Sequence, residues 1–371
     1  MERLLCVKIA SRGDLLLAAP AFRMLRERHP NALIELLVGR SCKDVAQHLP
    51  YFDSIQTIDD YALMGSGWLA RFCEAWNFYQ LIKGHGYRNK LIAQHEKVSG
   101  KILYSEVLIF HRDWRYGFLT WLARVPIRKG FYSKKGHYFL THPYRPKDDE
   151  HHVFQYLKMV FLEDEDRVIS SQVTLAGIWQ FAPAEKERAL MAAETYGFKN
   201  QSGNWVALGF GGGHNVKTRS ELKCWPVDHY HHLAELLVKY GCSVVWVGDG
   251  EDAQILRDLS IGINLAGKLS VAETAAVLSV CQRVIANDTL ILHLAEAMGV
   301  PTIGLFGPTD PAHYRPLGMY STHLWLGKKL SCSPCHQNGY FPPCHFQHRC
   351  MMELSVESVF DTFLQKVEES K

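Results

Sequence analysis

Short apolar runs alternate with segments of helical periodicity along this chain, and this alternation restricts the fold more than any other feature. Residues 4–10 form an apolar run, residues 11–14 a polar turn, and residues 15–28 carry apolar side chains at helical spacing. Residues 32–38 form a second apolar run rich in β-forming residues. This order completes a βαβ unit of the parallel α/β kind. A further strand and helix are expected at residues 107–110 and 116–124.

A second series of such units follows in the C-terminal half. The pattern loosens over residues 163–187, where an acidic cluster and Pro183 indicate a domain boundary. The expected strands are 205–210, 243–247, 283–286 and 302–306, and the expected helices are 227–240, 251–259, 272–281, 289–298 and 355–369. The sequence therefore predicts an α/β protein with two Rossmann-like, doubly wound domains, at 1–180 and 181–350, and a terminal helix in 351–371. Two such sheets predict a cleft, with ligands at the carboxyl ends of the strands.

Composition excludes two classes of protein. The chain has 371 residues, 47% of them hydrophobic, so it can bury a full core and is not intrinsically disordered. No apolar run approaches the roughly 20 residues of a membrane-spanning helix, which excludes an integral membrane protein. Lys8, Arg12 and Asp14 interrupt the N-terminal apolar stretch, whereas a secretion signal has an unbroken one. The ten cysteines are mostly scattered and fit reduced thiols, so we expect a cytoplasmic protein.

Charge is distributed unevenly although the total is only +3. Residues 88–147 hold thirteen Lys and Arg against three acids, and aromatic residues are interleaved with them. This pattern favours an amphiphile or an anionic membrane surface, contacted peripherally, as a partner. A solvated basic face without a partner would give the same pattern. We do not expect nucleic acid, because no nucleic-acid-binding motif accompanies the charge.

Asp14 is the first candidate catalytic residue. It follows the first strand in the turn Ser11-Arg12-Gly13-Asp14, at the end where ligands are expected. A carboxylate there could take a proton from an acceptor hydroxyl. Alternatively, Asp14 only caps the following helix.

Three strand-to-helix junctions in the second half could bind a nucleotide sugar. Glycines followed by basic residues suit a phosphate, and acids after a strand suit a ribose or a sugar. The phosphate candidates are Gly211, Gly212, Gly213 and Lys217, the ribose candidates are Glu251 and Asp252, and the donor-sugar and phosphate candidates are Asp288, Thr289 and His293. The alternatives are a mobile surface loop for the glycines and simple helix capping for the acids.

Four cysteines cluster near the C-terminus, as Cys332-x2-Cys335-x8-Cys344-x5-Cys350. A tight pair with later thiols is typical of a tetrahedral metal site, so a structural Zn or Fe ion is possible here. His336, His345 or His348 could replace one of the thiols as a ligand. The alternative is a set of reduced, inert thiols in a proline-rich loop.

Taken in order, several motifs resemble glycosyltransferase family 9, the lipopolysaccharide heptosyltransferases. The resemblance covers most of the chain, and the order and spacing of the motifs are more specific than any one of them. The matching segments are residues 8–20, Leu25-Arg26, Pro30, residues 122–131, His152-Val153, Tyr156-Leu157, Lys223-Cys224-Trp225-Pro226, Asn287-Asp288-Thr289, His293-Leu294-Ala295, residues 304–311, Cys332-Ser333-Pro334-Cys335 and Cys350-Met351.

The resemblance implies a GT-B fold whose C-terminal helix crosses back onto the first domain. It implies inverting transfer of heptose from ADP-L-glycero-β-D-manno-heptose to a hydroxyl of the lipopolysaccharide inner core, without a catalytic metal. Asp14 would be the general base and Lys223 would neutralise the diphosphate. Asp288 and Thr289 would hold the donor sugar and phosphates, and Glu251 or Asp252 the ribose. The candidates for contacting the acceptor are Arg12, Arg112, Arg115 and Arg128.

Two alternatives to this function remain open at the level of sequence. One keeps the fold and changes the nucleotide sugar or the acceptor, which could be a protein. The other is a homologue that binds a nucleotide sugar without catalysis. The second alternative rests on Leu290, because the family usually has Gly or Ser after the Asp-Thr pair.

Overall fold

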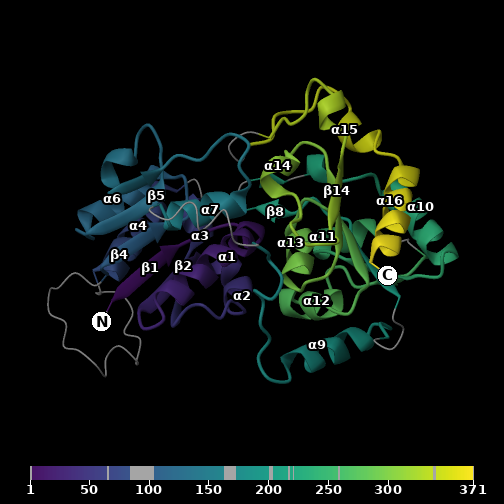
Figure 1. Ribbon diagram of the computed structural model, residues 1–371, viewed down its shortest axis with the longest axis horizontal. Helices are drawn as coiled ribbons and strands as arrows, with labels where there is room; N and C mark the ends of the chain where they lie inside the picture. The colour runs from purple at the N-terminus through teal and green to yellow at the C-terminus, as the bar shows by residue number, and fades with distance from the viewer. Residues whose placement is uncertain are drawn as a thin grey trace. The chain divides into compact units, whose positions relative to one another are not determined.

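A computed structural model describes residues 2–64, 67–83, 104–162, 173–199, 204–215, 218–219, 221–257, 260–336 and 340–370. The chain divides into two compact units, Met1–Gln172 (unit 1) and Val173–Lys371 (unit 2). Each unit is built on a six-stranded parallel sheet (Figure 1). Among the described residues, no helix combines the length and the apolar character needed to cross a membrane.

The sheet of unit 1 has the strand order β3-β2-β1-β4-β5-β6. Its strands are β1 (Arg3–Val7), β2 (Leu33–Gly39), β3 (Ser54–Ile58), β4 (Glu106–Ile109), β5 (Ile127–Phe131) and β6 (His142–Tyr144). Its longer helices are α1 (Arg12–Arg28), α4 (Trp68–Ile82), α6 (Trp114–Leu122) and α7 (His152–Val160). Val7 pairs with Leu37 on one side and Ile109 on the other, so β1, β2 and β4 end side by side.

Helices cover both faces of this sheet. Phe78 and Ile82 of α4 and Tyr116 of α6 share one core cluster with the strand residues Leu5 and Val107. The crossover through α1 runs along the sheet in the opposite direction to those through α4 and α6. Because parallel crossovers are right-handed, α1 lies on the opposite face, where it packs against α7.

The sheet of unit 2 has the order β11-β10-β7-β12-β13-β14. Its strands are β7 (Trp205–Gly209), β10 (Ser243–Val247), β11 (Ile263–Asn264), β12 (Arg283–Asn287), β13 (Thr302–Phe306) and β14 (Thr322–Trp325). Its longer helices are α9 (Glu185–Glu194), α10 (Val227–Lys239), α11 (Gly250–Ile255), α12 (Val271–Leu278), α13 (Leu290–Ala297) and α16 (Val356–Glu369). A short antiparallel pair, β8 (His214–Asn215) and β9 (Thr218–Arg219), follows β7.

The last helix, α16, packs within unit 2, and its expected packing on the first domain stays a prediction. Its apolar face, with Val359 and Phe363 fully buried, belongs to the core of unit 2, and the helix contacts α10. The buried guanidinium of Arg283 donates to the carbonyl of Lys366 at 2.9 Å, which ties the end of α16 to β12. The chain also divides after Gln172 rather than after residue 180. The prediction of two doubly wound sheets is confirmed.

Candidate functional site

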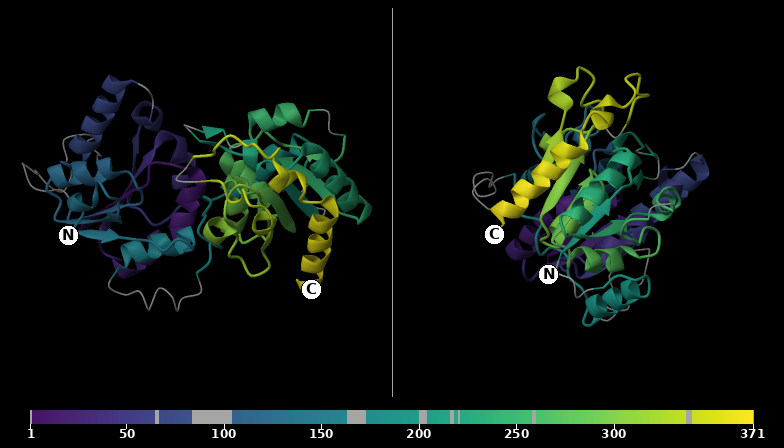
Figure 2. Two further views of the ribbon diagram at one scale, coloured as in Figure 1. Left: turned by 90° about the horizontal axis from the view of Figure 1, so that it is seen from above. Right: turned by 90° about the vertical axis from the view of Figure 1, so that its right-hand side faces the viewer.

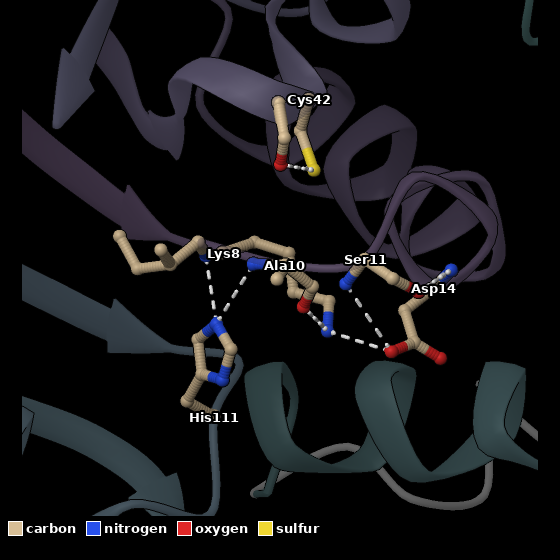
Figure 3. A network of polar contacts seen from close by, with 8 residues as sticks. Lys8, Ala10, Ser11, Asp14, Cys42 and His111 are labelled. Carbon is tan, nitrogen blue, oxygen red and sulfur yellow. Dashed lines mark hydrogen bonds and ion pairs between the residues drawn. The ribbon is translucent and has the colours of Figure 1, made fainter. Parts of the chain in front are cut away.

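In unit 1, Asp14 lies in the first turn of α1, directly after the central strand. Ser11 caps this helix: its hydroxyl accepts from the Asp14 N–H, and the Asp14 carboxylate accepts from the Ser11 N–H at 3.4 Å. Asp14 therefore takes part in the capping of α1, and its carboxylate also has a second partner. Lys8 Nζ lies 3.4 Å from Asp14 Oδ2 and 2.7 Å from the carbonyl oxygen of Ala10 (Figure 3).

Exposure separates the two members of this ion pair. The Lys8 side chain is 3% exposed and that of Asp14 is 32% exposed. Burial acts to raise the pKa of Asp14, but the charges of Lys8 and His152 and the Ser11 N–H hydrogen bond lower it to about 2. Asp14 is thus an ionised carboxylate at neutral pH, accessible from solvent and held by groups behind it.

His111 supports the same loop and was missed by the sequence analysis. Its Nε2 accepts from the backbone N–H groups of Ile9, at 2.7 Å, and Ala10, at 3.3 Å (Figure 3). Burial and the charge of Lys8 lower the pKa of His111 to about 3, so the ring stays neutral and keeps this acceptor. His111 directly follows the strand predicted at residues 107–110, and this position could have identified it as a site residue.

The four arginines proposed for the acceptor occupy different environments. Arg12 pairs with Asp44 through two nitrogens, at 3.1 and 2.8 Å, and Arg115 pairs with Asp113. Arg112 donates to the buried Gln155 at 2.7 Å and lies over the ring of Phe131. Arg128 donates to backbone carbonyls, including that of Phe139 at 2.6 Å, which is a structural role.

In unit 2, Lys223 and Asp288 meet at the end of β12. Lys223 Nζ donates to the carbonyl oxygen of Asp288 at 2.9 Å and to its carboxylate at 3.0 Å. His293 Nε2 lies 3.6 Å from the other carboxylate oxygen, and His293 Nδ1 lies 3.7 Å from Glu296. The capping alternative is wrong for Asp288, because Thr289 occupies the N-cap of α13 and makes no side-chain capping bond.

A nearly buried row of basic and acidic side chains results, in the order Lys223, Asp288, His293 and Glu296. Burial opposes ionisation of Asp288, but Lys223 and then His293 lower its pKa below the usual range. Burial likewise opposes protonation of His293, but Asp288 and Glu296 raise its pKa to about 9. The Lys223 side chain is 18% exposed and that of Asp288 is 4% exposed. Lys223 is therefore the more exposed member of this pair.

The glycine loop after β7 approaches the acids after β10. Asp249 caps α11 by accepting from the N–H groups of Glu251 and Asp252, and the Asp252 carboxylate accepts from the Asp249 N–H at 2.9 Å. Any side chain at Gly211 would collide with the Asp252 carboxylate, so glycine is required there. The capping alternative is thus confirmed for the buried Asp252, whereas Glu251 is exposed.

The rest of the loop runs toward the N-terminus of α13. Gly213 has a φ of +79°, and a Cβ there would lie 3.7 Å from Thr289 Cγ2. Gly212 lies between Gly211 and Gly213 and is partly exposed. Lys217 lies outside the described residues.

The four clustered cysteines are free thiols. Burial raises the pKa of Cys350, and Cys335, Cys344 and Cys332 contribute in that order, to give about 11. Cys344 is exposed and accepts from the His348 N–H at 3.4 Å. In the described part of the chain, no three His, Cys, Asp or Glu side chains are arranged to hold a metal ion.

Comparison with known proteins agrees with this arrangement. Residues 101–341 match the model of glycosyltransferase family 9 (heptosyltransferase). The chain belongs to glycosyltransferase family 9. It is 24% identical to lipooligosaccharide heptosyltransferase 2 of Haemophilus influenzae over 328 residues, which cover 85% of this chain and 86% of that protein.

Two solved structures show the same fold. A family 9 glycosyl transferase from Veillonella parvula has a TM-score of 0.74 and 19% identity, covering 99% of this chain and 97% of its own. ADP-heptose lps heptosyltransferase II of Escherichia coli has a TM-score of 0.71 and 16% identity over the whole of both chains. The family 9 chain is therefore a GT-B glycosyltransferase. The roles of its individual residues remain predictions.

Proposed function

We propose that the protein is an inverting glycosyltransferase that moves heptose from ADP-L-glycero-β-D-manno-heptose to a hydroxyl of the lipopolysaccharide inner core. Family membership and the heptosyltransferase names of its relatives support the sugar and the acceptor class. The observation that carries the proposal is the partly exposed Lys223, whose ammonium group is held by a buried carboxylate next to Thr289. Such a cation suits a diphosphate leaving group.

Asp14 would act as the general base. The acceptor oxygen attacks the anomeric carbon, its proton passes to an Asp14 carboxylate oxygen, and the bond from that carbon to the diphosphate oxygen breaks. Attack opposite the leaving group inverts the configuration. A carboxylate with a pKa of about 2 holds a proton weakly, so proton transfer would accompany bond formation rather than precede it.

Unit 2 would bind the donor. Lys223 and the N-terminus of α13 would neutralise the negative charge that develops on ADP, so this step needs no catalytic metal. The backbone of Gly211, Gly212 and Gly213 would approach the phosphates. Glu251 suits the ribose better than Asp252, because the Asp252 carboxylate is already bonded within its own helix cap.

The acceptor would reach unit 1 from a membrane. Phe131 and Asp113 line a small hollow. Arg112 lies over the ring of Phe131 and Arg115 pairs with Asp113, and both arginines would meet the anionic groups of a lipid-linked core. We place the enzyme in the cytoplasm, in peripheral contact with the anionic inner face of the inner membrane. The basic segment that contains both arginines supports this location.

Incubation with ADP-heptose and lipopolysaccharide from a heptose-deficient strain tests the proposal. We expect a product heavier by one heptose, read by mass spectrometry, and thermal stabilisation by ADP but not by UDP. Equal stabilisation by both nucleotides would indicate another donor. Stabilisation by ADP without transfer to any truncated core would support a non-catalytic homologue, which Leu290 at the start of α13 favours.

A structural metal is proposed separately for Cys332, Cys335, Cys344 and Cys350. Four thiols at the spacing Cys332-x2-Cys335-x8-Cys344-x5-Cys350 suit Zn or Fe chemically. The thiols would have to draw closer on binding. Elemental analysis of the purified protein tests this, and the absence of stoichiometric metal would exclude the site.

A further inference from the structure

Helix α4 carries a stripe of large apolar side chains on its outward side. Trp68, Leu69, Phe72 and Trp76 are 73%, 59%, 64% and 52% exposed. Their spacing places them along one side of the helix, while Phe78 and Ile82 are buried in the core of unit 1. Isolated exposed apolar residues are common, but four along one helix indicate a surface with a partner.

Helix α6 extends this surface. It packs against α4 on the same face of the sheet, where Phe78 and Tyr116 meet edge to face with ring centroids 5.7 Å apart. Trp121 and Leu122 of α6 are about half exposed. The views of Figure 2 show α4, in indigo, at the margin of unit 1. We call the six residues Trp68, Leu69, Phe72, Trp76, Trp121 and Leu122 the aromatic face.

Positive charge lies beside the α6 part of the aromatic face, whereas α4 itself carries one basic and one acidic residue, Arg71 and Glu74. Residues 104–147 contain nine Lys and Arg and only two acids, Glu106 and Asp113, each of which is paired with a basic residue. Arg124 is exposed just after α6, and Lys134 and Lys135 are exposed just before η2 (His137–Phe139), which contacts α6. An apolar centre with a cationic border is complementary to an anionic lipid surface.

We propose that the aromatic face is a docking surface for an anionic lipid bilayer. Tryptophan has an apolar ring and an N–H donor, which suit the boundary between headgroups and acyl chains. Lys and Arg beside it would meet anionic headgroups. A second copy fits less well, because a two-fold interface through this face would place the same basic residues, Arg124, Lys134 and Lys135, on both sides of the interface.

This inference rests on the proposed function in one respect, since docking at a membrane would aid transfer only if the acceptor is lipid-linked. Helices α4 and α6 belong to the same unit as Asp14. Docking through them would hold unit 1 at the membrane that presents the acceptor. Neither Asp14 nor the proposed acceptor arginines belong to the aromatic face, so binding to lipid and transfer can be measured separately.

The experiment measures co-sedimentation of the full chain with vesicles of phosphatidylcholine alone or of equimolar phosphatidylcholine and phosphatidylglycerol. We expect binding to the mixed vesicles only. Trp68→Ser, Phe72→Ser and Trp76→Ser together should weaken it at least about tenfold. Arg124→Gln, Lys134→Gln and Lys135→Gln together should also weaken it, with a smaller dependence on salt in the remaining binding. Met191→Ser with Met319→Ser, at exposed residues of unit 2, is the matched control.

Thermal unfolding would establish that the variants are folded, and transfer to a delipidated core oligosaccharide would establish that their chemistry is intact. Binding by the aromatic variant that equals the binding of the wild type overturns the proposal. The proposal is also overturned if the wild type does not bind vesicles but forms oligomers that the aromatic variant cannot form. That result would indicate an interface between copies of the chain. A wild-type protein that binds the mixed vesicles but transfers no heptose would instead refute the proposed function.

Discussion

Units 1 and 2 each place a lysine and an aspartate together at the end of a parallel strand, but with opposite exposure. In unit 1 the cation Lys8 is buried and the carboxylate of Asp14 is one-third exposed. In unit 2 the carboxylate of Asp288 is buried and the Lys223 side chain is the more exposed partner. The same ion pair therefore presents a base in one unit and a cation in the other. In unit 1, the charge of the buried Lys8 lowers the pKa of the outer partner, Asp14.

The largest expected effect is on the exposed carboxylate. Asp14→Asn keeps the shape and a capping oxygen but cannot accept the proton, so transfer should fall about 10²–10⁴-fold. Product formation followed by mass spectrometry measures this. Asp44→Asn removes another carboxylate of unit 1, the partner of Arg12, and should cost far less. A full rate in Asp14→Asn would show that Asp14 only caps its helix.

The second largest effect on transfer is expected for Lys223, the more exposed partner in unit 2. Lys223→Met removes the charge that would stabilise the departing diphosphate, and we expect a loss of about 10²–10³-fold in kcat. Lys268→Met is the control, because Lys268 also belongs to unit 2 and donates to a backbone carbonyl, that of Asn264. Equal rates in both variants would remove Lys223 from the mechanism.

The two aspartates of these ion pairs should differ in their effect on stability. Asp288→Ala leaves Lys223 and a protonated His293 facing each other in a buried site, and should lower the free energy of unfolding by about 3–5 kcal/mol. Asp14→Ala removes a partly exposed carboxylate and one member of a helix cap, and should cost about 1–2 kcal/mol. Urea unfolding measures both. Equal losses would contradict the difference in burial.

The pH dependence of stability should differ between the units as well. The pKa of His293 is raised to about 9, so its contribution is complete below the unfolded pKa of about 6.5 and is lost as the pH rises through 9. The loss should reach as much as about 3 kcal/mol. The pKa of Asp14 is lowered to about 2, so its contribution is present above about pH 4 and is lost as the pH falls through 2.

Urea unfolding at a series of pH values measures these slopes. His293→Gln should abolish the loss of stability between about pH 6.5 and 9. Asp14→Asn should leave that loss unchanged and reduce the loss of stability between about pH 4 and 2. An alkaline slope that survives in His293→Gln would assign it to another group.

The smallest expected effect distinguishes the two acids after β10. Glu251→Gln should raise the KM for the donor about tenfold if the exposed carboxylate holds the ribose, with little change in stability. Asp252→Asn should instead lower the stability, because its carboxylate is buried in a capping box. A raised KM in Asp252→Asn with unchanged stability would reverse the assignment. Donor titrations and urea unfolding measure the two effects.

Buried strands could be predicted well from the sequence, and edge strands could not. Strands β10 and β13 begin and end where the sequence predicts, because strands covered on both faces have continuous apolar runs. Strands β3, β5 and β14 were not predicted. They lie toward the edges of their sheets, and most of their residues are partly exposed. They also carry polar residues such as Gln56 and Lys129.

The candidate site divides in the same way. Local order along the chain placed Asp14, Asp288 and the glycine loop at strand ends, because in a parallel sheet those ends share one edge. His111, Glu296 and the aromatic face of α4 were not predicted. Their roles depend on contacts with residues far away in the sequence, such as the Ile9 N–H for His111.

By itself, then, the sequence determined the family, the two parallel sheets and the residue types at the strand ends. These are encoded locally, in the periodicity of apolar residues and in motifs of a few residues. The tertiary structure decided which member of each lysine–aspartate pair is buried, which of Glu251 and Asp252 is committed to a cap, and where α16 packs. Exposure and pairing depend on distant segments, and so they become defined only when the chain is folded.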